Sequence, residues 1–309
     1  MSDWWSVHFP QGKQVTTIID ANGHPVELAW GERGTGATLL LLHGWGSWSV
    51  SWQALIMPLA RYFRVVCFDA KGYGYSQRSR TPEVIGHQIV ETLRFIEKIR
   101  ENQPIFILAE SLGAWVALHL AAEYPHLIKK LVVISPPVYP QMMPNWAMRL
   151  FVKIPRPVVR LADYFRMIRL FAPLLVYLTH QQQKEVYCHS EKVSIDAVRT
   201  LLFPYFTQKN SLLPLIEDTR LAALELAKYQ KKQPNLISQL QQELSLIRCP
   251  VLILWGERDR WFPVHDAYRL QQDLPQAQLQ ILSECGHHAV EDCPDQVMRH
   301  LLPFFNVKI

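Results

Sequence analysis

The sequence has few cysteines, and their arrangement indicates neither a disulfide framework nor a metal site. Five cysteines, at positions 67, 188, 249, 285 and 293, are scattered over 309 residues, and no C-x-x-C motif occurs. An odd and scattered set is typical of free thiols in a reducing compartment. We therefore expect a cytoplasmic protein that holds no metal.

Long apolar runs and targeting segments are also missing. No run of 18 apolar residues occurs, so the sequence predicts no membrane-spanning helix. The first residues, MSDWWSVHFP, lack the basic and apolar regions of a signal peptide, so we expect none. With 49% hydrophobic and 19% charged residues, the chain is expected to fold as one large domain or one domain with an insertion.

The net charge of +5 is unevenly distributed along the chain. Residues 139–245 contain 14 lysines and arginines against 8 acidic residues, whereas the remainder contains 18 against 19. A protein that binds nucleic acid over its whole surface would not segregate its charge in this way. We therefore expect no nucleic-acid partner.

What the sequence contains is a series of short apolar runs separated by helical patterns. Six runs predict strands, at residues 37–44, 63–70, 104–111, 129–137, 250–257 and 281–287. Five segments predict helices, at residues 51–61, 86–100, 112–123, 265–273 and 294–305. Runs that are apolar on both faces suit a parallel sheet covered by helices on each side. The alternation predicts an α/β doubly wound, mostly parallel sheet, which binds ligands at the carboxyl ends of its strands.

Two segments depart from this alternation. Residues 15–31 contain two strand-like runs around Asn22-Gly23, which predicts a hairpin. Residues 139–245 contain prolines, aromatic residues and helical patterns, without strand alternation. We therefore predict a core formed by residues 1–138 and 246–309, with a helical cap inserted at 139–245.

The stretch Ala109-Glu110-Ser111-Leu112-Gly113 is the first candidate for chemistry, because it joins an apolar strand to a helix. A serine at this place often serves only to cap the helix. A tight strand-to-helix turn that presents a nucleophilic serine needs small residues two positions before and after it, as found here. Taken alone, the motif leaves both interpretations open.

A nucleophilic serine needs a base and an orienting carboxylate. His287 and His288 lie in the loop after the last predicted strand, at the same edge of the sheet as Ser111. Asp259 lies just past the run PVLILWG at this edge, and Glu257 is its competitor. The chain order Ser, Asp, His is one of the known orders of a catalytic triad.

An acyl-transfer site also needs donors for the oxyanion. Leu112 directly follows the serine and offers its backbone N–H at the start of a helix. The loop His43-Gly44-Trp45-Gly46 follows another strand, and its glycines allow a substrate to approach the backbone closely. We predict the Trp45 N–H as second donor; a simple glycine turn is the alternative.

Together these motifs resemble the α/β-hydrolase superfamily with a helical cap, and the match covers nearly the whole core. The motifs are HGWG at 43–46, DAKGYGYS at 69–76, AESLGA at 109–114, GERD at 256–259 and GHHAVEDCP at 286–294. The resemblance implies Ser111 as nucleophile, Asp259 as acid and His287 as base. It also places Trp45 and Leu112 at the oxyanion positions.

The sequence departs from the family pattern at two positions. Ala109 replaces a glycine, and Lys71 replaces an arginine in a stretch that we interpret as structural. A serine nucleophile implies an acyl-enzyme, so we expect a carboxylic ester hydrolase that uses no metal or organic cofactor. A carbon–carbon bond hydrolase with the same triad is the alternative, and a ligand receptor that retains only the fold is a third hypothesis.

Residues 146–180 are the most informative clue to the substrate. They contain six basic residues and one acidic residue among aromatic and aliphatic side chains: Arg149, Lys153, Arg156, Arg160, Arg166 and Arg169, with Asp163. The last three arginines and Asp163 recur every third residue, so we expect them on one side of the cap. The segment is either a cap with a solvated basic face or a surface that contacts an anionic membrane.

Three tryptophans lie near the predicted oxyanion loop. Trp45, Trp48 and Trp52 either pack in the core or line an apolar pocket, and we predict Trp48 and Trp52 as pocket residues. Both clues favour a bulky, lipophilic small-molecule substrate. The whole pattern thus predicts a cytoplasmic serine esterase whose cap can contact a membrane surface.

Overall fold

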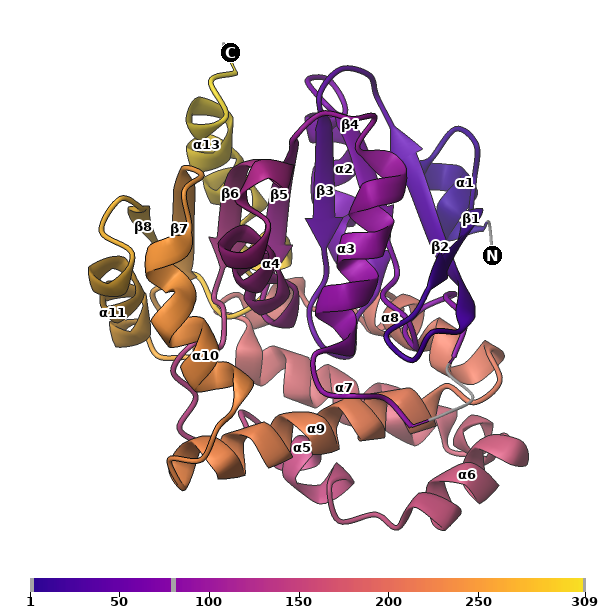
Figure 1. Cartoon of the computed structure of the whole chain (residues 1–309). Coiled ribbons are helices and arrows are strands. Elements are labelled where there is room, and N and C mark those ends of the chain that lie inside the picture. The colour runs from indigo at the N-terminus through magenta and orange to yellow at the C-terminus, as the bar shows by residue number, and fades with distance from the viewer. Residues whose placement is uncertain (1–2, 79–81, 308–309) are drawn as a thin grey trace.

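The computed structural model describes residues 3–78 and 82–307, and its centre is an eight-stranded sheet (Figure 1). The strands are β1 (Gln14–Ile19), β2 (Pro25–Arg33), β3 (Thr38–Leu42), β4 (Arg64–Phe68), β5 (Ile105–Glu110), β6 (Ile128–Ile134), β7 (Val251–Gly256) and β8 (Gln278–Leu282). Their spatial order is β1-β2-β4-β3-β5-β6-β7-β8. β2 pairs antiparallel with β1 and β4, and the remaining pairs are parallel. The predicted α/β fold with a mostly parallel sheet is confirmed.

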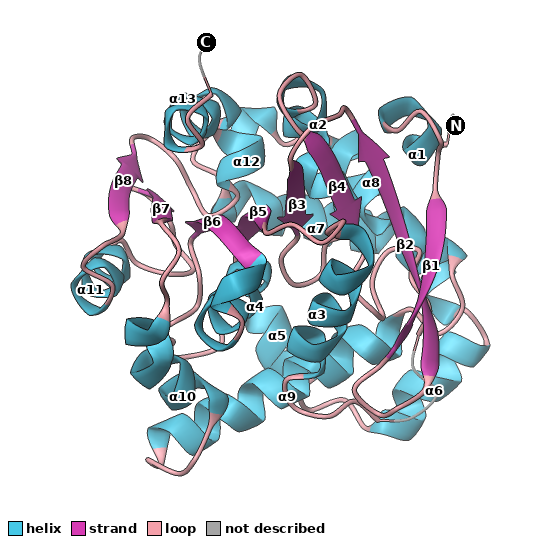
Figure 2. Cartoon of the chain, turned by 45° about the horizontal axis from the view of Figure 1, so that its top comes forward, coloured by secondary structure: helices cyan, strands magenta, loops and turns pink. Residues whose placement is uncertain are grey.

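Helices cover both faces of this sheet, as Figure 2 shows. One face packs against α3 (His87–Ile99), α4 (Leu112–Glu123), α10 (Leu236–Glu243) and α11 (His265–Asp273). The other face packs against α1 (Trp4–His8), α2 (Gln53–Leu59), α12 (Ala289–Asp292) and α13 (Pro294–Phe304). Because side chains alternate along a strand, Leu40 and Leu42 of β3 join the first layer while Leu39 and Leu41 join the second. This two-sided burial explains the continuous apolar runs in the sequence.

Most of the predicted elements form close to their predicted bounds. The hairpin around Gly23 is present, with Ile19 opposite Pro25, and α4 and α11 span the predicted residues. The last strand is an exception, because the prediction of a strand at 281–287 is wrong. β8 spans Gln278–Leu282 and lies at the edge of the sheet, where its alternating exposure suits the mixed residues at its start. Residues 283–287 instead form the loop after it, in which Glu284 has a φ of +48°.

Five helices inserted after β6 lie beyond the carboxyl ends of the parallel strands, at the bottom of Figure 1. They are α5 (Trp146–Phe151), α6 (Arg156–Tyr164), α7 (Ala172–Val186), α8 (Ile195–Thr207) and α9 (Leu212–Gln230). This helical insertion is consistent with the predicted cap. α10 packs against α4 of the core, with Leu240 fully buried between the layers. The boundaries at 138 and 245 stay predictions.

Short 3₁₀ helices complete the described secondary structure. They are η1 (Ser49–Trp52), η2 (Pro125–Leu127), η3 (Met167–Arg169), η4 (Ser190–Lys192) and η5 (Leu244–Leu246). Among the helices of residues 3–78 and 82–307, none is long and apolar enough to cross a membrane. All five cysteines are free thiols.

The prediction that Arg160, Asp163, Arg166 and Arg169 lie together on one side of the cap is wrong for Asp163. α6 ends at Tyr164, and Arg166 adopts a left-handed conformation with a φ of +52°. Asp163 is buried and accepts hydrogen bonds from the backbone N–H groups of Leu212 and Leu213, at the start of α9. The chain therefore turns at Arg166, within this charged stretch, and the one acidic residue of the segment binds inward.

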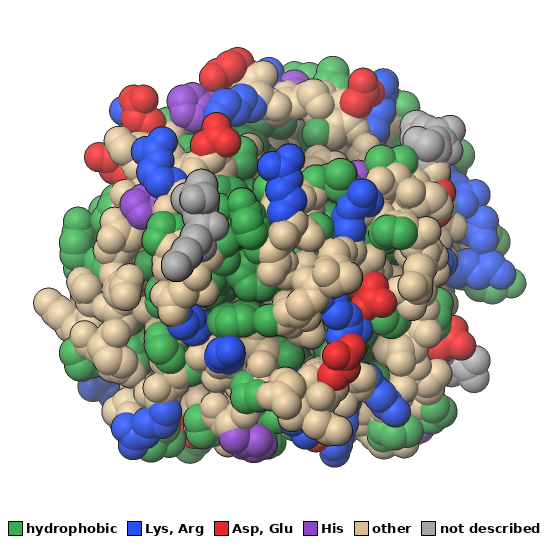
Figure 3. All heavy atoms as spheres, turned by 90° about the horizontal axis from the view of Figure 1, so that it is seen from above, with side chains coloured by type: hydrophobic (Ala, Val, Ile, Leu, Met, Phe, Trp, Pro, Cys, Tyr) green, Lys and Arg blue, Asp and Glu red, His purple; other side chains and the backbone are tan. Residues whose placement is uncertain are grey.

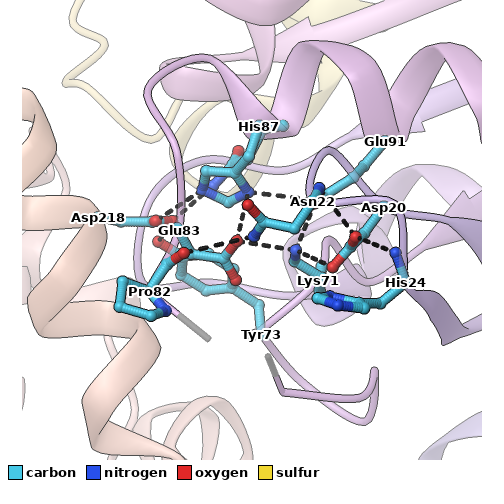
Figure 4. Close-up of polar contacts among 11 residues, drawn as sticks. Asp20, Asn22, His24, Lys71, Tyr73, Pro82, Glu83, His87, Glu91 and Asp218 are labelled. Atoms are coloured by element: carbon cyan, nitrogen blue, oxygen red, sulfur yellow. Dashed lines mark hydrogen bonds and ion pairs between the residues drawn. The ribbon is translucent and has the colours of Figure 1, made fainter. Parts of the chain in front are cut away.

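Lys71, one of the two residues that depart from the family pattern, is fully buried among three carboxylates (Figure 4). Its ammonium lies 3.0 Å from Asp20 in the hairpin turn, 2.8 Å from Glu83 and 2.5 Å from Glu91 on α3. Burial lowers the pKa of Lys71, but the carboxylates outweigh it and hold that pKa above its usual value. A buried charge is tolerated only when it is paired in this way. Lys71 therefore ties the hairpin to α3.

We expect Lys71→Met to destabilise the fold by about 3–5 kcal/mol, because it leaves several buried carboxylates without their cation. Lys98→Met is the control, since Lys98 is exposed on α3, the helix that carries Glu91, and its loss should change stability by less than about 0.5 kcal/mol. Urea unfolding followed by circular dichroism measures both. Equal losses of stability in the two variants would contradict this account of the cluster.

Candidate active site

Ser111 occupies the turn between β5 and α4 alone, since β5 ends at Glu110 and α4 begins at Leu112. Its backbone has a φ of +53° and a ψ of −121°, a conformation that costs free energy and needs support from its surroundings. That support includes a 2.8 Å hydrogen bond from the Ser111 N–H to the carbonyl of Ile134. The strain turns the side chain out of the sheet at the carboxyl edge.

Gly113 and Ala109, two positions after and before Ser111, lie in different steric surroundings. A Cβ at Gly113 would lie 2.5 Å from the Leu42 carbonyl oxygen, so no larger residue fits there without moving β3. Ala109 is fully buried in β5, opposite Leu42 on one side and Val133 on the other. Its methyl group packs in the layer that contains α3 and α4. The strand thus accepts one methyl where the family pattern has a glycine.

The structure brings Ser111, Asp259 and His287 together, although they come from three different loops. Nε2 of His287 lies 3.1 Å from Oγ of Ser111, and Nδ1 of His287 lies 2.8 Å from a carboxylate oxygen of Asp259. The side chains of Asp259 and His287 are fully shielded from solvent. These contacts form the Ser–His–Asp chain in which a histidine can take a proton from a serine hydroxyl.

Backbone donors fix the carboxylate of Asp259. Its second oxygen accepts hydrogen bonds from the N–H groups of Trp261 and Phe262, at 2.8 and 2.9 Å. Burial raises the pKa of Asp259, but the interaction with His287 and these N–H groups outweigh burial, so the pKa lies below its usual value. The carboxylate is therefore ionised and held in one orientation toward the imidazole.

The competing residues are placed elsewhere. Glu257 is exposed, and its carboxylate accepts from the Glu284 N–H rather than from His287. Burial, followed by the charge of His287, lowers the pKa of His288 to about 3. His288 thus stays neutral beside the site, while His287 faces the serine.

The loop after β3 brings Trp45 and its neighbours against Ser111. A Cβ built on Gly44 would lie 3.1 Å from Cβ of Ser111, which shows how closely the two backbones approach. His43 holds this loop: its Nε2 accepts from the Ala70 N–H at 3.0 Å, and its Nδ1 lies 2.9 Å from the Gly44 carbonyl oxygen. Burial lowers the pKa of His43 to about 4, so the ring is neutral and can accept and donate at once. Sequence reasoning had not given His43 this role.

Leu112 is the first residue of α4, where a backbone N–H has no partner within the helix. The loop that carries Trp45 also lies against Ser111, where its Gly44 approaches the serine closely. Both predicted oxyanion donors therefore belong to segments next to the serine.

A cavity of about 190 Å³ opens beside Ser111 under the cap. Its lining is predominantly apolar and includes Trp45, Trp115, Met142, Met143, Met148, Leu226, Trp261 and Phe262, together with Ser111 and Leu112. The methionines and Leu226 come from the segment 139–245, and the remainder come from the core. No single stretch of sequence carries this pattern, which is why the sequence did not reveal the cavity.

The prediction of Trp48 and Trp52 as pocket residues is wrong. Both are buried in the core layer beneath the sheet, and neither lines the cavity. Trp48 packs edge-on against Trp4 and Tyr75, and its indole N–H donates to the carbonyl of Leu201 in α8. Of the three tryptophans, only Trp45 reaches the cavity.

One polar pair lies in the wall of this cavity. Nε2 of His87 on α3 lies 2.9 Å from a carboxylate oxygen of Asp218 on α9, and Nδ1 faces Glu91 (Figure 4). Burial lowers the pKa of His87, but Asp218 and Glu91 outweigh it and raise that pKa to about 10. The other Asp218 oxygen accepts from Tyr73 at 2.8 Å and from Gln88 at 2.6 Å. Asp218 thus fastens α9 to the core directly above the site.

Two groups of side chains in the described part of the chain have the spacing of metal ligands. In the first, Glu83 and Glu91 bind the Lys71 ammonium, which already supplies a cation there. In the second, the Asp292 carboxylate accepts from the backbone N–H groups of Gly286, Cys188 and His189. These bonds hold the loop of His287 against the end of α7, so both groups have structural partners.

Glu110, next to Ser111, is a buried acid that the sequence analysis did not single out. Burial, followed by the charge of Glu291, raises the pKa of Glu110 to about 8. Burial also raises the pKa of Glu291 to about 7, and this residue accepts a hydrogen bond from the Tyr187 hydroxyl. At neutral pH the Glu110 carboxyl therefore mostly keeps its proton, while Glu291 is close to half protonated.

Comparisons with known proteins agree with this architecture. A family model described as alpha/beta hydrolase fold matches residues 37–294. The chain is 23% identical over 294 residues to a cis-3-alkyl-4-alkyloxetan-2-one decarboxylase of Shewanella oneidensis, covering 93% of this chain and 87% of that protein. It is also 23% identical to monoacylglycerol lipase ABHD6 of Bos taurus, covering 89% of this chain and 77% of that protein.

A solved structure, the meta-cleavage product hydrolase of Pseudomonas fluorescens IP01, superimposes with a TM-score of 0.71 at 17% identity. The match covers 94% of this chain and 97% of that one. At this identity the likeness shows the fold alone.

We expect Ala109→Gly to preserve turnover and Ala109→Leu to abolish it, because the larger side chain would displace the strand that carries Ser111. Steady-state kinetics on the purified variants measure the effect, and circular dichroism checks that each variant is folded. A folded Ala109→Leu variant with unchanged turnover would show that the turn is not cramped.

The raised pKa of Glu110 predicts how stability changes with pH. In the fold this carboxyl keeps its proton to about pH 8, whereas the unfolded chain releases it near its ordinary pKa of 4.5. Its contribution is therefore present below about pH 4.5 and is lost as the pH rises to about 8. We expect the loss of Tm between pH 5 and pH 8 to be smaller in Glu110→Gln than in the wild type. Glu257→Gln, at an exposed site, is the control, and parallel pH profiles for all three proteins would refute the assignment.

Proposed function

Because this chain belongs to the α/β-hydrolase fold family, we propose that it is a serine hydrolase that cleaves a carboxylic ester of a hydrophobic substrate. The observation that carries the proposal is the hydrogen-bonded chain from Asp259 through His287 to Ser111, with the serine at the wall of an apolar cavity. A buried base within reach of a serine hydroxyl is the arrangement that nucleophilic acyl transfer needs.

In the proposed mechanism, Nε2 of His287 removes the proton from Oγ of Ser111 as the oxygen attacks the ester carbonyl. Asp259 stabilises the imidazolium that forms, because its ionised carboxylate faces Nδ1. The N–H groups of Trp45 and Leu112 bind the oxyanion of the tetrahedral intermediate. His287 then protonates the departing alkoxide, which leaves an acyl-enzyme on Ser111. Water, activated by His287, hydrolyses this second ester and restores the serine.

The cavity supports a lipophilic substrate. Its wall consists mainly of tryptophan, methionine, leucine and proline side chains, which exchange water for an apolar chain at little cost. Methionines adapt their shape to different chains, so the cavity suits a flexible alkyl or acyl group better than one rigid ring. The monoacylglycerol lipase among the relatives is named for a lipid ester, which agrees with this substrate class.

A carbon–carbon bond hydrolase with the same triad is the second candidate. The likeness to a meta-cleavage product hydrolase supports it at the level of the fold. A binding protein that keeps the fold without turnover is the third, and the hydrogen-bonded triad argues against it. The two enzymes differ in the bond cleaved, and the binding protein differs in lacking an activated serine.

A fluorophosphonate probe tests for the activated serine, and a series of p-nitrophenyl esters of rising chain length tests for esterase activity. We expect the wild type to be labelled, and Ser111→Ala and His287→Ala each to lower kcat by at least about 10⁴-fold. The double variant should be no worse than either, since the two residues act as a unit. Ser283→Ala, at an exposed serine, is the control and should behave as the wild type.

An unlabelled wild type that also leaves every ester intact would refute the serine hydrolase. Labelling without ester turnover, combined with cleavage of a vinylogous 1,5-diketone, would favour the carbon–carbon hydrolase. A preference for long over short chains in kcat/KM is expected from the apolar cavity.

A further inference from the structure

The outer surface of the cap carries an unusual set of exposed apolar side chains. Ten of them lie between α6 and the first half of α7, and each is between 39% and 78% exposed. They are Val158, Leu161, Tyr164, Phe165, Met167, Leu170, Phe171, Leu174, Tyr177 and Leu178, which we call the apolar corner. A contiguous apolar patch at the surface is typical of a site that contacts another apolar phase or partner.

The spacing of these residues shows that they form outward helix faces. On α6, Val158 and Leu161 are separated by three residues, and Phe165 follows four residues later, directly after the helix ends; on α7, Leu174 and Leu178 are separated by four. Residues at these spacings lie on one side of a helix. The inward sides hold the buried contacts, such as Val159. Both helices therefore present their apolar side to solvent, the reverse of what a surface helix needs for solubility alone.

Basic side chains flank the apolar corner without acidic partners. Arg149, Lys153, Arg160, Arg166 and Lys209 form no ion pair within the part of the chain that the structure describes. Arg160, Arg166 and Lys209 line one groove between the cap and the hairpin β1–β2. The one acidic residue of segment 146–180, Asp163, is buried and bonded to backbone N–H groups. The segment therefore exposes positive charge only.

The end of the molecule opposite the cap has a different distribution of charged side chains. Figure 3, which views the end away from the cap, shows acidic and basic side chains mixed over that surface. A surface that combines exposed aromatic and aliphatic residues with uncompensated cations complements an anionic lipid bilayer, because the apolar groups enter the interface while the cations bind headgroups.

Exposed apolar residues also lie at the edge of the cavity. Met142 lines the cavity and is 59% exposed, so the cavity reaches solvent at the start of the cap. On the next helix, α5, Met148 points into the cavity while Trp146 and Leu150 are exposed. In Figure 1, α5 and α6 both lie on the side of the cap away from the sheet.

From these observations we propose that the cap is a membrane-docking surface that binds the interface of an anionic phospholipid bilayer through the apolar corner and its flanking cations. Docking requires no turnover, so it is independent of the proposed hydrolase activity. It places the mouth of the cavity at the lipid surface, where a lipophilic substrate can leave the bilayer without crossing water.

Sedimentation with sucrose-loaded vesicles tests the proposal. We expect the wild type and Ser111→Ala to bind vesicles of phosphatidylglycerol and phosphatidylcholine equally, and to bind pure phosphatidylcholine at least about tenfold more weakly. The Ser111→Ala protein separates docking from catalysis, since it should lose ester turnover and keep vesicle binding.

Matched variants locate the surface. Tyr164→Ser should lower binding severalfold, whereas Tyr268→Ser, at an exposed tyrosine of α11, should not. The double variant Arg160→Glu, Lys209→Glu should lower binding to anionic vesicles at least about tenfold, and Arg61→Glu, at an exposed arginine beyond α2, should change it far less. Circular dichroism spectra and melting temperatures that match those of the wild type would show that all four variants are folded.

Three outcomes would overturn the proposal. The first is a wild type that stays in the supernatant with anionic vesicles. The second is equal binding by Tyr164→Ser and Tyr268→Ser. The third is a concentration-dependent dimer in analytical ultracentrifugation that Tyr164→Ser abolishes, because the apolar corner would then pair two copies of the chain and be covered in solution.

Discussion

The left-handed backbone of Ser111 is the constraint on which the arrangement of the site depends. The turn exists only because Gly113 lets α4 approach the carbonyl groups of Leu42 and His43, and because the Ser111 N–H is bonded to β6. It holds the serine where the loops after β7 and β8 bring Asp259 and His287. Strain at one residue is thus maintained by three neighbouring strands, which is how a rigid sheet can position a reactive side chain.

The core of the fold could be predicted because its physics is local and periodic. Strands buried on both faces leave continuous apolar runs, and parallel strands bring the loops that follow them to one edge. For this reason the positions of Ser111, Asp259 and His287 after three predicted strands placed them at one edge, and the resemblance to the family selected them over Glu257 and His288. β8 was misplaced because it is an edge strand, with alternating exposure in place of a continuous run.

The cap and the cavity could not be predicted to the same depth. Trp48 and Trp45 lie three residues apart in the same loop, yet one packs in the core and the other lines the cavity, and tertiary packing alone decides between them. Asp163 looks like part of a charged helix face in the sequence, but it binds the start of α9. In the sequence, Lys71 is only a replacement for an arginine. Its structural role follows from the ion pairs with Asp20, Glu83 and Glu91, which only the fold brings together.

The ion pair between His87 and Asp218 bears on how the cavity can admit a ligand. Lifting α9 from the core would separate Asp218 from His87, Gln88 and Tyr73 at once, leaving charged groups in an apolar setting. The Gln141 carbonyl beside Met142 accepts a hydrogen bond from the Gln230 side chain, and Met142 itself is exposed where it lines the cavity. The bonds of Asp218 therefore hold α9 against the cavity, and the exposed edge of the cavity lies at Met142, shortly before α5 in the chain.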